Sequence, residues 1–222
     1  MLRQWLRWVY CLLTIMMGIA FCPVAVCQAM DRKTGVHKVV YLTFDDGPSL
    51  IYTPKILTVL QQEHVHATFF ILGARAQKFP NIARRIVKDG HEIGNHGYCH
   101  DFLKHKDPTW VGKDVRKTDT IIHQITGAYP RYYRPPGGII NSIETRSVRT
   151  LGHPVALWTV DSRDWATPNS DIIVRRVLAA VQPGSIILMH DGVSNSRFTV
   201  LALPQIIERL HAAGYEFARL PL

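Results

Sequence analysis

Cysteine is scarce in this chain of 222 residues, and three of its four cysteines lie near the amino terminus, at Cys11, Cys22 and Cys27. Cys99 is therefore the single cysteine of the remaining sequence. One cysteine cannot form an internal disulfide framework or a four-cysteine zinc site. Charged residues are also few, at 19%, whereas hydrophobic residues make up 47%. This balance is typical of a globular protein, and it excludes a disordered tail and a collagen-like repeat.

The sequence also lacks a glycine-rich phosphate loop and any stripe of basic residues interleaved with aromatic ones. Lys and Arg nevertheless outnumber Asp and Glu by 26 to 17, which gives a formal charge of +9. An excess of this size favours an anionic partner: nucleic acid, a membrane surface or an anionic wall polymer. Because the phosphate loop and the basic–aromatic stripe are both missing, we expect no nucleic-acid partner.

The run Trp8–Cys27 contains no charged side chain. Arg3 and Arg7 precede this apolar run, and small residues follow it. A basic start, an apolar centre and a small-residue exit are typical of a secretory signal peptide. We therefore predict that residues 1–29 form a signal peptide that is cleaved after Ala29.

Two alternatives to cleavage remain open. The uncharged run is 20 residues long, and a membrane-spanning helix needs about 20, so residues 1–29 can also be an uncleaved membrane anchor. Pro23 near the end of the run favours cleavage. A lipid anchor at Cys27 is disfavoured, because Val26 is bulky where a small residue is expected. In every case the body of the protein is exported, to the periplasm, the cell envelope or the medium. Cleavage would remove two positive charges and lower the net charge from +9 to +7.

From residue 37 onward, short β-branched or aromatic runs alternate with amphipathic stretches. The runs are Lys38–Phe44, Ala67–Leu72, Glu92–Asn95, Arg131–Arg134, Pro154–Val160, Ser185–His190 and Tyr215–Leu220. Strand–helix alternation over about 185 residues predicts a parallel sheet with crossover helices. We expect one α/β domain, residues 37–222, folded as a distorted, incomplete (β/α) barrel of about seven parallel strands. A full eightfold barrel typically needs about 250 residues.

Polar side chains suited to catalysis follow the ends of the predicted strands. They are Asp45 and Asp46 after the first strand, His96 and His100 after the third, Arg134 at the end of the fourth, Asp161 and Asp164 after the fifth, and His190 at the end of the sixth. The carboxyl ends of parallel strands in a barrel meet on one face, where active sites are built. We therefore expect these side chains to lie close together.

Each motif also has a purely structural interpretation. Asp45-Asp46-Gly47-Pro48 consists largely of turn-forming residues, yet two adjacent carboxylates repel each other unless a cation lies between them. The pair His96-x-x-x-His100 can lie in a surface loop as well as in a metal site. Two histidines and one aspartate would form a three-ligand metal site with one position open for water.

Five motifs occur in order: Thr43-Phe44-Asp45-Asp46-Gly47-Pro48, His96-x-x-x-His100, Arg134-Pro135-Pro136, Asp161-x-x-Asp164-Trp165 and Leu188-x-His190. With these motifs the chain resembles the polysaccharide deacetylases of the NodB-homology type, carbohydrate esterase family 4, across residues 37–222. The resemblance implies metal-dependent hydrolysis of the N-acetyl group of an N-acetylglucosamine-containing cell-envelope polysaccharide, with release of acetate.

The resemblance also implies how the metal and the base are held. Asp46, His96 and His100 would bind one divalent transition metal, which assists the attack of water on the amide. Asp45 would be the general base, kept ionised and oriented by Arg134. Because two imidazoles and one carboxylate are a borderline donor set, we expect Zn²⁺, with Co²⁺ or Ni²⁺ able to substitute.

His190 would protonate the leaving amine, with Asp164 fixing its tautomer and raising its pKa. The residues expected to contact the oxyanion or the substrate are Gly137, Pro136, Trp165 and Leu188. For Trp165 and Leu188, plain packing in the core is an equally good interpretation. Asp161 can be structural.

Two positions depart from the family pattern. Gly97 stands where a Ser or Thr usually steadies the metal loop, so a lower metal affinity is expected. Gly137 stands where the family usually has Tyr. Glycine keeps the backbone N–H expected to hold the oxyanion, but we expect the ring that lines the subsite to be lost, which affects substrate preference.

Peptidoglycan is the expected substrate, because the chain is exported, basic and without a separate lectin module. Chito-oligosaccharide, poly-N-acetylglucosamine and acetylated xylan remain alternatives. A non-catalytic glycan-binding relic of the same fold would have lost the base, a metal ligand or the acid, and the sequence keeps all of them. A phosphate-handling or nucleic-acid-binding protein would need the motifs that are missing here.

Overall fold

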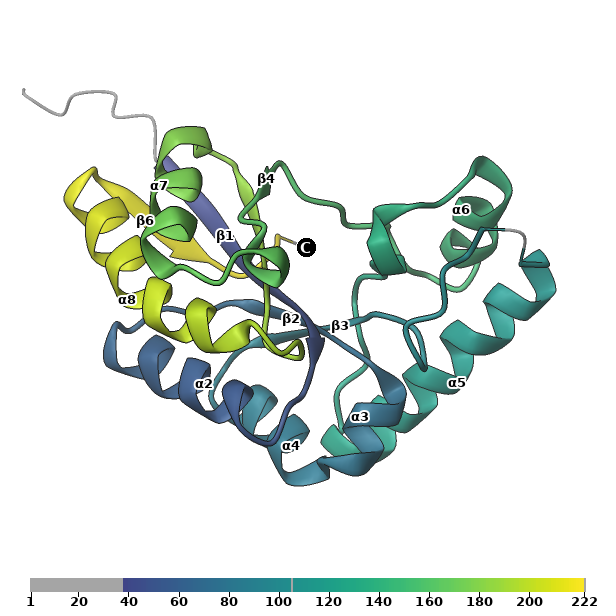
Figure 1. Ribbon diagram of the computed structural model, residues 1–222. Helices are drawn as coiled ribbons and strands as arrows, with labels where there is room; N and C mark the ends of the chain where they lie inside the picture. Colours follow the sequence, from purple (N-terminus) through teal and green to yellow (C-terminus); the bar gives the residue numbers. More distant parts are fainter. Residues whose placement is uncertain (1–37, 105, 222) are drawn as a thin grey trace, which may run out of the picture. The chain divides into compact units, whose positions relative to one another are not determined.

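The longest strand of the fold, β1 (Lys38–Gly47), lies inside a parallel sheet (Figure 1). The computed structural model describes residues 38–104 and 106–221, so the predicted signal peptide or anchor at residues 1–29 lies outside the described residues. The other strands are β2 (Thr68–Ile71), β3 (Glu92–Asn95), β4 (Val160–Asp161), β5 (Ile186–His190) and β6 (Tyr215–Ala218). Their order is β3-β2-β1-β5-β4, and β6 pairs with β1.

Every strand pairing is parallel. The carboxyl ends of the strands therefore meet at one edge of the sheet. The crossover segments between strands carry the helices. Their bounds are α2 (Tyr52–Gln62), α3 (Gly73–Lys78), α4 (Pro80–Lys88), α5 (Pro108–Thr126), α6 (Ser142–Arg149), α7 (Ser170–Ala180) and α8 (Ser196–Ala212), with 3₁₀ turns η2 (Pro136–Gly138) and η3 (Asp164–Ala166).

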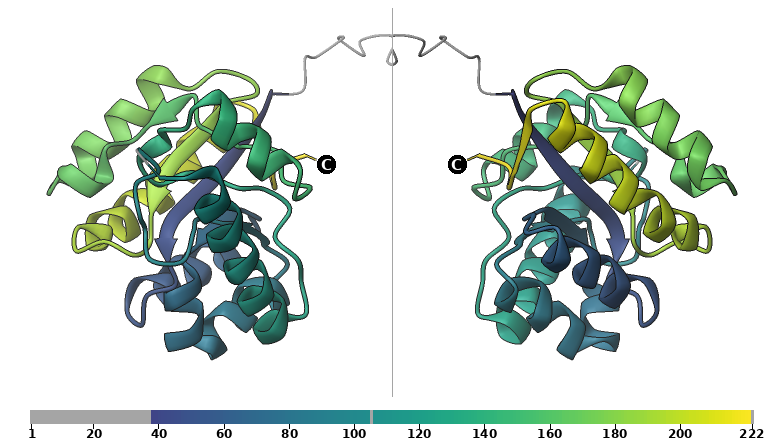
Figure 2. Two further views of the ribbon diagram at one scale, coloured as in Figure 1. Left: turned by 90° about the vertical axis from the view of Figure 1, so that its right-hand side faces the viewer. Right: turned by 90° about the vertical axis from the view of Figure 1, so that its left-hand side faces the viewer.

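The helices pack pairwise along an arc outside the sheet (Figures 1 and 2). Helix α6 packs on α5, α5 on α3 and α4, α4 on α2, α2 on α8, and α8 on α7. Local sequence signals mark several of their ends. Asp107 accepts a hydrogen bond from the Thr109 N–H and caps α5, Pro108 opens that helix, and Gly127 ends it with φ of +76°.

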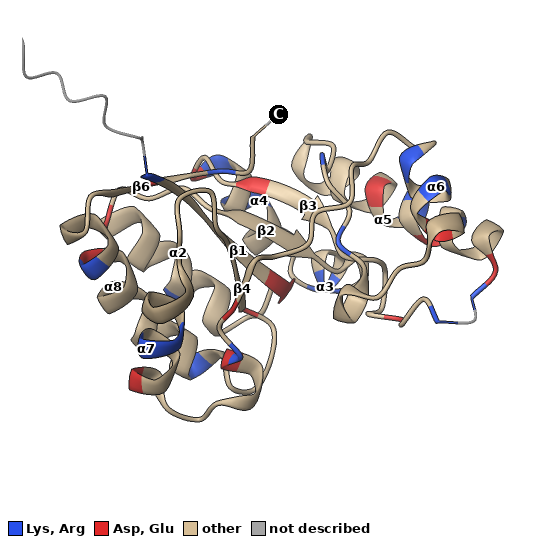
Figure 3. Ribbon diagram, turned by 90° about the horizontal axis from the view of Figure 1, so that it is seen from above, with Lys and Arg blue, Asp and Glu red and all other residues tan. Residues whose placement is uncertain are grey.

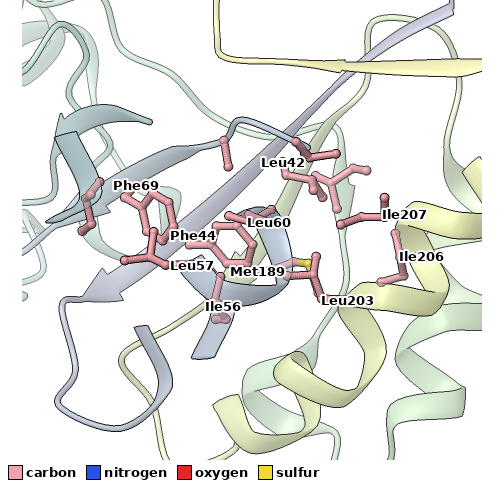
Figure 4. Close-up of a cluster of buried hydrophobic side chains, with 14 of the residues drawn as sticks. Leu42, Phe44, Ile56, Leu57, Leu60, Phe69, Met189, Leu203, Ile206 and Ile207 are labelled. Carbon is pink, nitrogen blue, oxygen red and sulfur yellow. The ribbon is translucent and has the colours of Figure 1, made fainter. Parts of the chain in front are cut away.

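The main core lies between the sheet and helices α2 and α8, as Figure 4 shows. On β1, the alternate residues Val40, Leu42 and Phe44 are fully buried against these helices. Phe44 stacks on Phe69 of β2, with ring centroids 5.0 Å apart. The residues between them, Thr43 among them, point to the opposite side, the inside of the barrel. Burial of one large aliphatic or aromatic side chain contributes about 1.5–3 kcal/mol.

The barrel is incomplete, as predicted, but one expected strand is almost absent and another is much shorter, since of the expected strand Pro154–Val160 only Val160 lies in β4. Of the run Arg131–Arg134, only Tyr133 pairs, through single bridges to Asn95 and to Val155. Pro130, Pro135 and Pro154 interrupt this region, and proline lacks the N–H that a ladder needs. The sheet is therefore not closed between β3 and β4.

Lys and Arg lie mainly on the helices and loops around the sheet, whereas most of the strand residues are uncharged (Figure 3). Within residues 38–104 and 106–221, no helix is both long enough and apolar enough to cross a lipid bilayer. Residues 37–222 form one compact unit.

Candidate active site

Asp45 and Asp46 lie within β1, directly before its last residue Gly47, and not beyond its end as the sequence suggested. Asp45 pairs with His190 of β5, and the register with β2 shifts between Asp45 and Gly47. Asp46 is thus an extra residue in the strand, with φ of +70°. Neighbouring side chains of a regular strand point to opposite faces, but a bulge changes their direction. Both carboxylates consequently line the same cavity.

Asp46, His96 and His100 form a cluster whose potential ligand atoms all lie within 4.8 Å of one another. The Nε2 atoms of His96 and His100 lie 3.4 and 3.3 Å from Asp46 Oδ1. His96 Nδ1 lies 2.7 Å from the carbonyl oxygen of Arg134. Because a carbonyl can only accept, this nitrogen donates its proton, and Nε2 is the ring nitrogen that faces Asp46.

The electrostatics of the cluster favour a positive charge at its centre. Burial raises the pKa of Asp46, but the adjacent His96 imidazole outweighs this effect and lowers the pKa to about 2. Burial lowers the pKa of His96, yet the carboxylates of Asp45 and Asp46 raise it overall. Burial also lowers the pKa of the more exposed His100. The Asp46 carboxylate is thus ionised and attracts a cation.

The donor set fits a divalent metal ion. Asp46 Oδ1 is buried and has no hydrogen-bond donor within the described residues, and an unsatisfied buried carboxylate oxygen is costly unless a cation binds it. Two imidazoles and one carboxylate are ligands that zinc and neighbouring transition metals accept. These three residues could therefore hold the ion.

Arg134 lies behind the cluster, completely buried inside the barrel. Its Nη1 donates to Asp45 Oδ1 and to Thr43 Oγ1, both at 2.8 Å. Its other nitrogens donate to the carbonyl oxygens of Ala156 and Leu157. A buried guanidinium with these partners is fixed in position, and so is the carboxylate that it contacts.

His190 ends β5, and its imidazole is held by Asp164. His190 Nδ1 donates to Asp164 Oδ1 at 2.8 Å, and the His190 backbone N–H donates to Oδ2 at 2.7 Å. Thr199 of α8 also donates to Oδ2, at 2.6 Å. Burial alone would lower the pKa of His190, but the hydrogen bond and charge of Asp164 raise it to about 9. His190 is therefore cationic near neutral pH, with Nε2 free of the Asp164 contact.

One cavity of about 390 Å³ connects these groups. Its lining includes Asp45, Asp46, His96, His100, Gly137, Asp161, Trp165, Leu188 and His190. Trp165 is 52% exposed and therefore is no core residue, whereas Leu188 is buried at the cavity wall. Pro136 is buried and is not among the residues that line the cavity. Asp164 and Arg134 do not line the cavity, but they contact the lining residues His190 and Asp45.

The sequence did not predict which residues hold the loop that carries His96 and His100. Gly97 has φ of +80°, and its N–H donates to Asn95 Oδ1 at 2.7 Å. The next N–H, of Tyr98, donates to Asp114 Oδ2 of α5 at 3.0 Å. The side chains of Asn95 and Asp114 thus hold this loop, although Gly97 provides no hydroxyl group. No local signal marks Asp114, because it lies sixteen residues further along the chain.

Asp191 was also missed. It is fully buried next to His190, and it accepts a hydrogen bond from Thr53. Gly47 lies against its carboxyl group, where a Cβ atom would come within 2.2 Å of Asp191 Oδ2. Burial raises the pKa of Asp191 to about 7, and the charges of Asp45 and Asp46 act in the same direction. Asp191 therefore explains why glycine follows the two aspartates.

Phe102 and Trp158 complete the cavity wall, and neither was predicted. The sequence suggested that Gly137 leaves the subsite without a ring. The structure instead places the Phe102 ring against Gly137. The contact joins two loops that are distant in sequence, so only the folded chain reveals it.

An open parallel barrel with an Asp-His-His cluster, an arginine-bound carboxylate and a cationic histidine around one cavity defines a hydrolase of the metal-dependent type. The family model for polysaccharide deacetylases matches residues 32–156. A peptidoglycan-N-acetylglucosamine deacetylase of Bacillus cereus is 41% identical over 183 residues, which cover 82% of this chain and 66% of that protein.

A chitooligosaccharide deacetylase of Bradyrhizobium sp. is 39% identical over 194 residues, which cover 82% of this chain and 89% of that protein. The crystal structure of the Bc1960 peptidoglycan N-acetylglucosamine deacetylase in complex with 4-naphthalen-1-yl-N-oxidanyl-benzamide matches with a TM-score of 0.81 at 40% identity. That match covers 84% of this chain and 87% of the other. The chain belongs to the polysaccharide deacetylase family.

Proposed function

We propose that this protein removes acetyl groups from N-acetylglucosamine in a cell-envelope polysaccharide, with peptidoglycan as the first candidate and a chitin-like glycan as the second. The names of its relatives support both candidates: one is a peptidoglycan-N-acetylglucosamine deacetylase, and another is a chitooligosaccharide deacetylase. The formal charge of +9 supports an anionic polymer.

One observation carries the proposal: base, metal ligands and acid line a single cavity of about 390 Å³. Hydrolysis of an amide needs a proton acceptor for water and a proton donor for the amine. Asp45 and His190 provide these two functions from paired positions on neighbouring strands. If Asp45 and His190 were purely structural, the two side chains would not both need to line a cavity.

A divalent metal held by Asp46, His96 and His100 would supply Lewis acidity toward the acetyl carbonyl and the attacking water. Asp45 accepts the proton of that water. The Arg134 contact at 2.8 Å fixes the orientation of the Asp45 carboxylate.

His190 donates the proton from Nε2 to the leaving amine nitrogen. Asp164 accepts from Nδ1, so it fixes the tautomer and stabilises the imidazolium. The backbone N–H of Gly137 serves as a donor to the oxyanion. Trp165 and Leu188 enclose the acetyl methyl group.

The identity of the metal and the location of the protein belong to the same proposal. The donor set favours Zn²⁺, with Co²⁺ or Ni²⁺ as functional substitutes. Cleavage or anchoring of residues 1–29 would place residues 37–222, the catalytic domain, outside the cytoplasm. There the domain reaches cell-wall glycans.

The test measures acetate release by the purified, metal-loaded chain from peptidoglycan, chito-oligosaccharide, poly-N-acetylglucosamine and acetylated xylan. We expect acetate from the N-acetylglucosamine polymers, with peptidoglycan the best substrate. Release from acetylated xylan alone would refute N-deacetylation. Binding of a glycan without any acetate release would favour a non-catalytic glycan-binding protein.

A further inference from the structure

Gly137 lines the cavity and Gly138 follows it, with φ of +68° and +70°. A Cβ atom on Gly137 would lie 2.7 Å from Phe102 Cε1, and one on Gly138 would lie 2.5 Å from Trp158 Cη2. Both distances are shorter than any normal contact between carbon atoms. The two rings thus occupy the space that side chains at these positions would need, and glycine alone allows this approach.

Phe102 lies on the loop between β3 and α5, two residues beyond His100. Its ring is 55% exposed although it lines the cavity. The ring meets the His100 imidazole edge to face, with centroids 5.4 Å apart and planes at 81°. A large aromatic ring packed on bare backbone and on one imidazole is held in place, yet its free face remains open to a ligand.

Trp158 and Trp165 line the same cavity, so three aromatic side chains contribute to its lining. Ligand sites are typically lined by aromatic side chains with a few polar groups that set orientation. A sugar ring of a glycan presents an apolar C–H face beside polar edges. An exposed aromatic face is the surface that such a C–H face can cover.

We propose that Phe102 is a specificity-determining residue: its ring is the stacking surface for a sugar of the glycan chain at the mouth of the cavity. The inference rests on the proposed function and adds how the polymer is recognised. Phe102 takes no part in proton transfer. Its contribution is to bind the glycan and thus to distinguish a sugar polymer from a small acetylated compound.

The competing explanation is that Phe102 only supports His100. A supporting role predicts that truncation of the ring weakens metal binding and slows every substrate equally. A stacking role predicts that the loss depends on the sugar chain. The two explanations therefore differ in measurable quantities.

The experiment compares the purified full-length chain with Phe102→Ala and Phe102→Tyr. Tyr129→Ala is the matched control, because Tyr129 is 66% exposed and stacks on His123 at 3.8 Å, away from the cavity lining. For each protein we measure metal content, kcat and KM for tetra-N-acetylchitotetraose, and kcat/KM for 4-nitrophenyl acetate.

We expect Phe102→Ala to raise KM for the tetramer about tenfold, which is the scale of one aromatic stacking contact. Metal content and kcat/KM for the small ester should stay at the wild-type level. Phe102→Tyr should retain the wild-type KM, and Tyr129→Ala should change nothing. Equal losses on the tetramer and the ester, or a loss of metal, would overturn the proposal, as would an unchanged KM.

A binding titration separates this inference from the proposed function. Chelator-treated protein is titrated with tetra-N-acetylchitotetraose while tryptophan fluorescence is recorded, since Trp158 and Trp165 line the cavity. If the wild type releases no acetate from any glycan, the proposed function fails. The stacking role of Phe102 then stands if Phe102→Ala still weakens this binding, and it fails if the variant binds as tightly as the wild type.

Discussion

Asp164 holds His190 by two hydrogen bonds at once, one to the imidazole Nδ1 at 2.8 Å and one to the backbone N–H at 2.7 Å. A buried carboxylate thus fixes both the position and the charge of the proton donor. Because the pKa of His190 is raised to about 9, the imidazolium persists below that pH and is lost as the pH rises through it.

The first prediction concerns the alkaline limb of the pH–rate profile. Asp164→Asn removes the charge that offsets burial, so the pKa of His190 falls and the limb moves to lower pH. Metal content should not change. Initial rates on an N-acetylated oligomer between pH 6 and about 10 measure the limb. Asp161→Asn is the matched control, because Asp161 lines the cavity without a hydrogen bond to His190. A limb that stays in place in Asp164→Asn would contradict the assignment of His190 as the acid.

The second prediction compares leaving groups. His190→Ala should lower turnover of an amide by about a hundredfold or more, the usual scale of general acid catalysis. An ester should lose less, because an alcohol leaves more easily than an amine. Parallel kcat measurements on an acetamide and an acetate ester of the same sugar test whether His190 protonates the leaving group. Equal slowing of both would assign His190 to binding.

The third prediction separates the adjacent carboxylates. Asp46→Asn should lose metal affinity, since Asp46 Oδ1 is 3.3–3.4 Å from both imidazoles. Asp45→Asn should keep the metal and lose turnover, because a base acts only in the chemical step. Metal content after dialysis and kcat are measured for both variants. Equal metal loss would mean that the two carboxylates bind the ion jointly and that the base is another group.

The fourth prediction tests the loop that carries His96 and His100. Asp114→Ala removes the acceptor for the Tyr98 N–H, so metal affinity should fall about tenfold, as is typical when a residue that orients metal ligands is lost. Asp114→Asn keeps an acceptor oxygen and should stay close to the wild type. Competition with a metal chelator measures the affinity. If Asp114→Ala binds metal as tightly as the wild type, the loop is held by Asn95 alone.

Much of the fold follows from short-range patterns. The short β-branched or aromatic runs of β1 and β5 predict strands of a parallel sheet, and helix ends such as Gly127 carry their own backbone signal. Parallel topology then places residues such as His96 and His190 at one edge. What these patterns cannot predict depends on contacts that are distant in sequence.

The bulge at Asp46 is one example, because it results from how β1 fits β2 and β5 together. A strict two-residue alternation would have turned Asp46 away from Asp45. The placement of Phe102 against Gly137 is another, since it joins two separate loops. The two isolated bridges of Tyr133, in place of a strand, reflect prolines whose effect on pairing depends on their neighbours.

Hydrolysis of an N-acetyl group by a metal-dependent site has two products that can be measured directly. Acetate and newly formed primary amine are quantified together after the purified chain acts on an N-acetylglucosamine oligomer, with and without chelator treatment. We expect equimolar acetate and amine, loss of both after chelation, and recovery with Zn²⁺ or Co²⁺. Cleavage of the glycan chain without acetate release, or full activity after complete removal of metal, would contradict metal-dependent N-deacetylation.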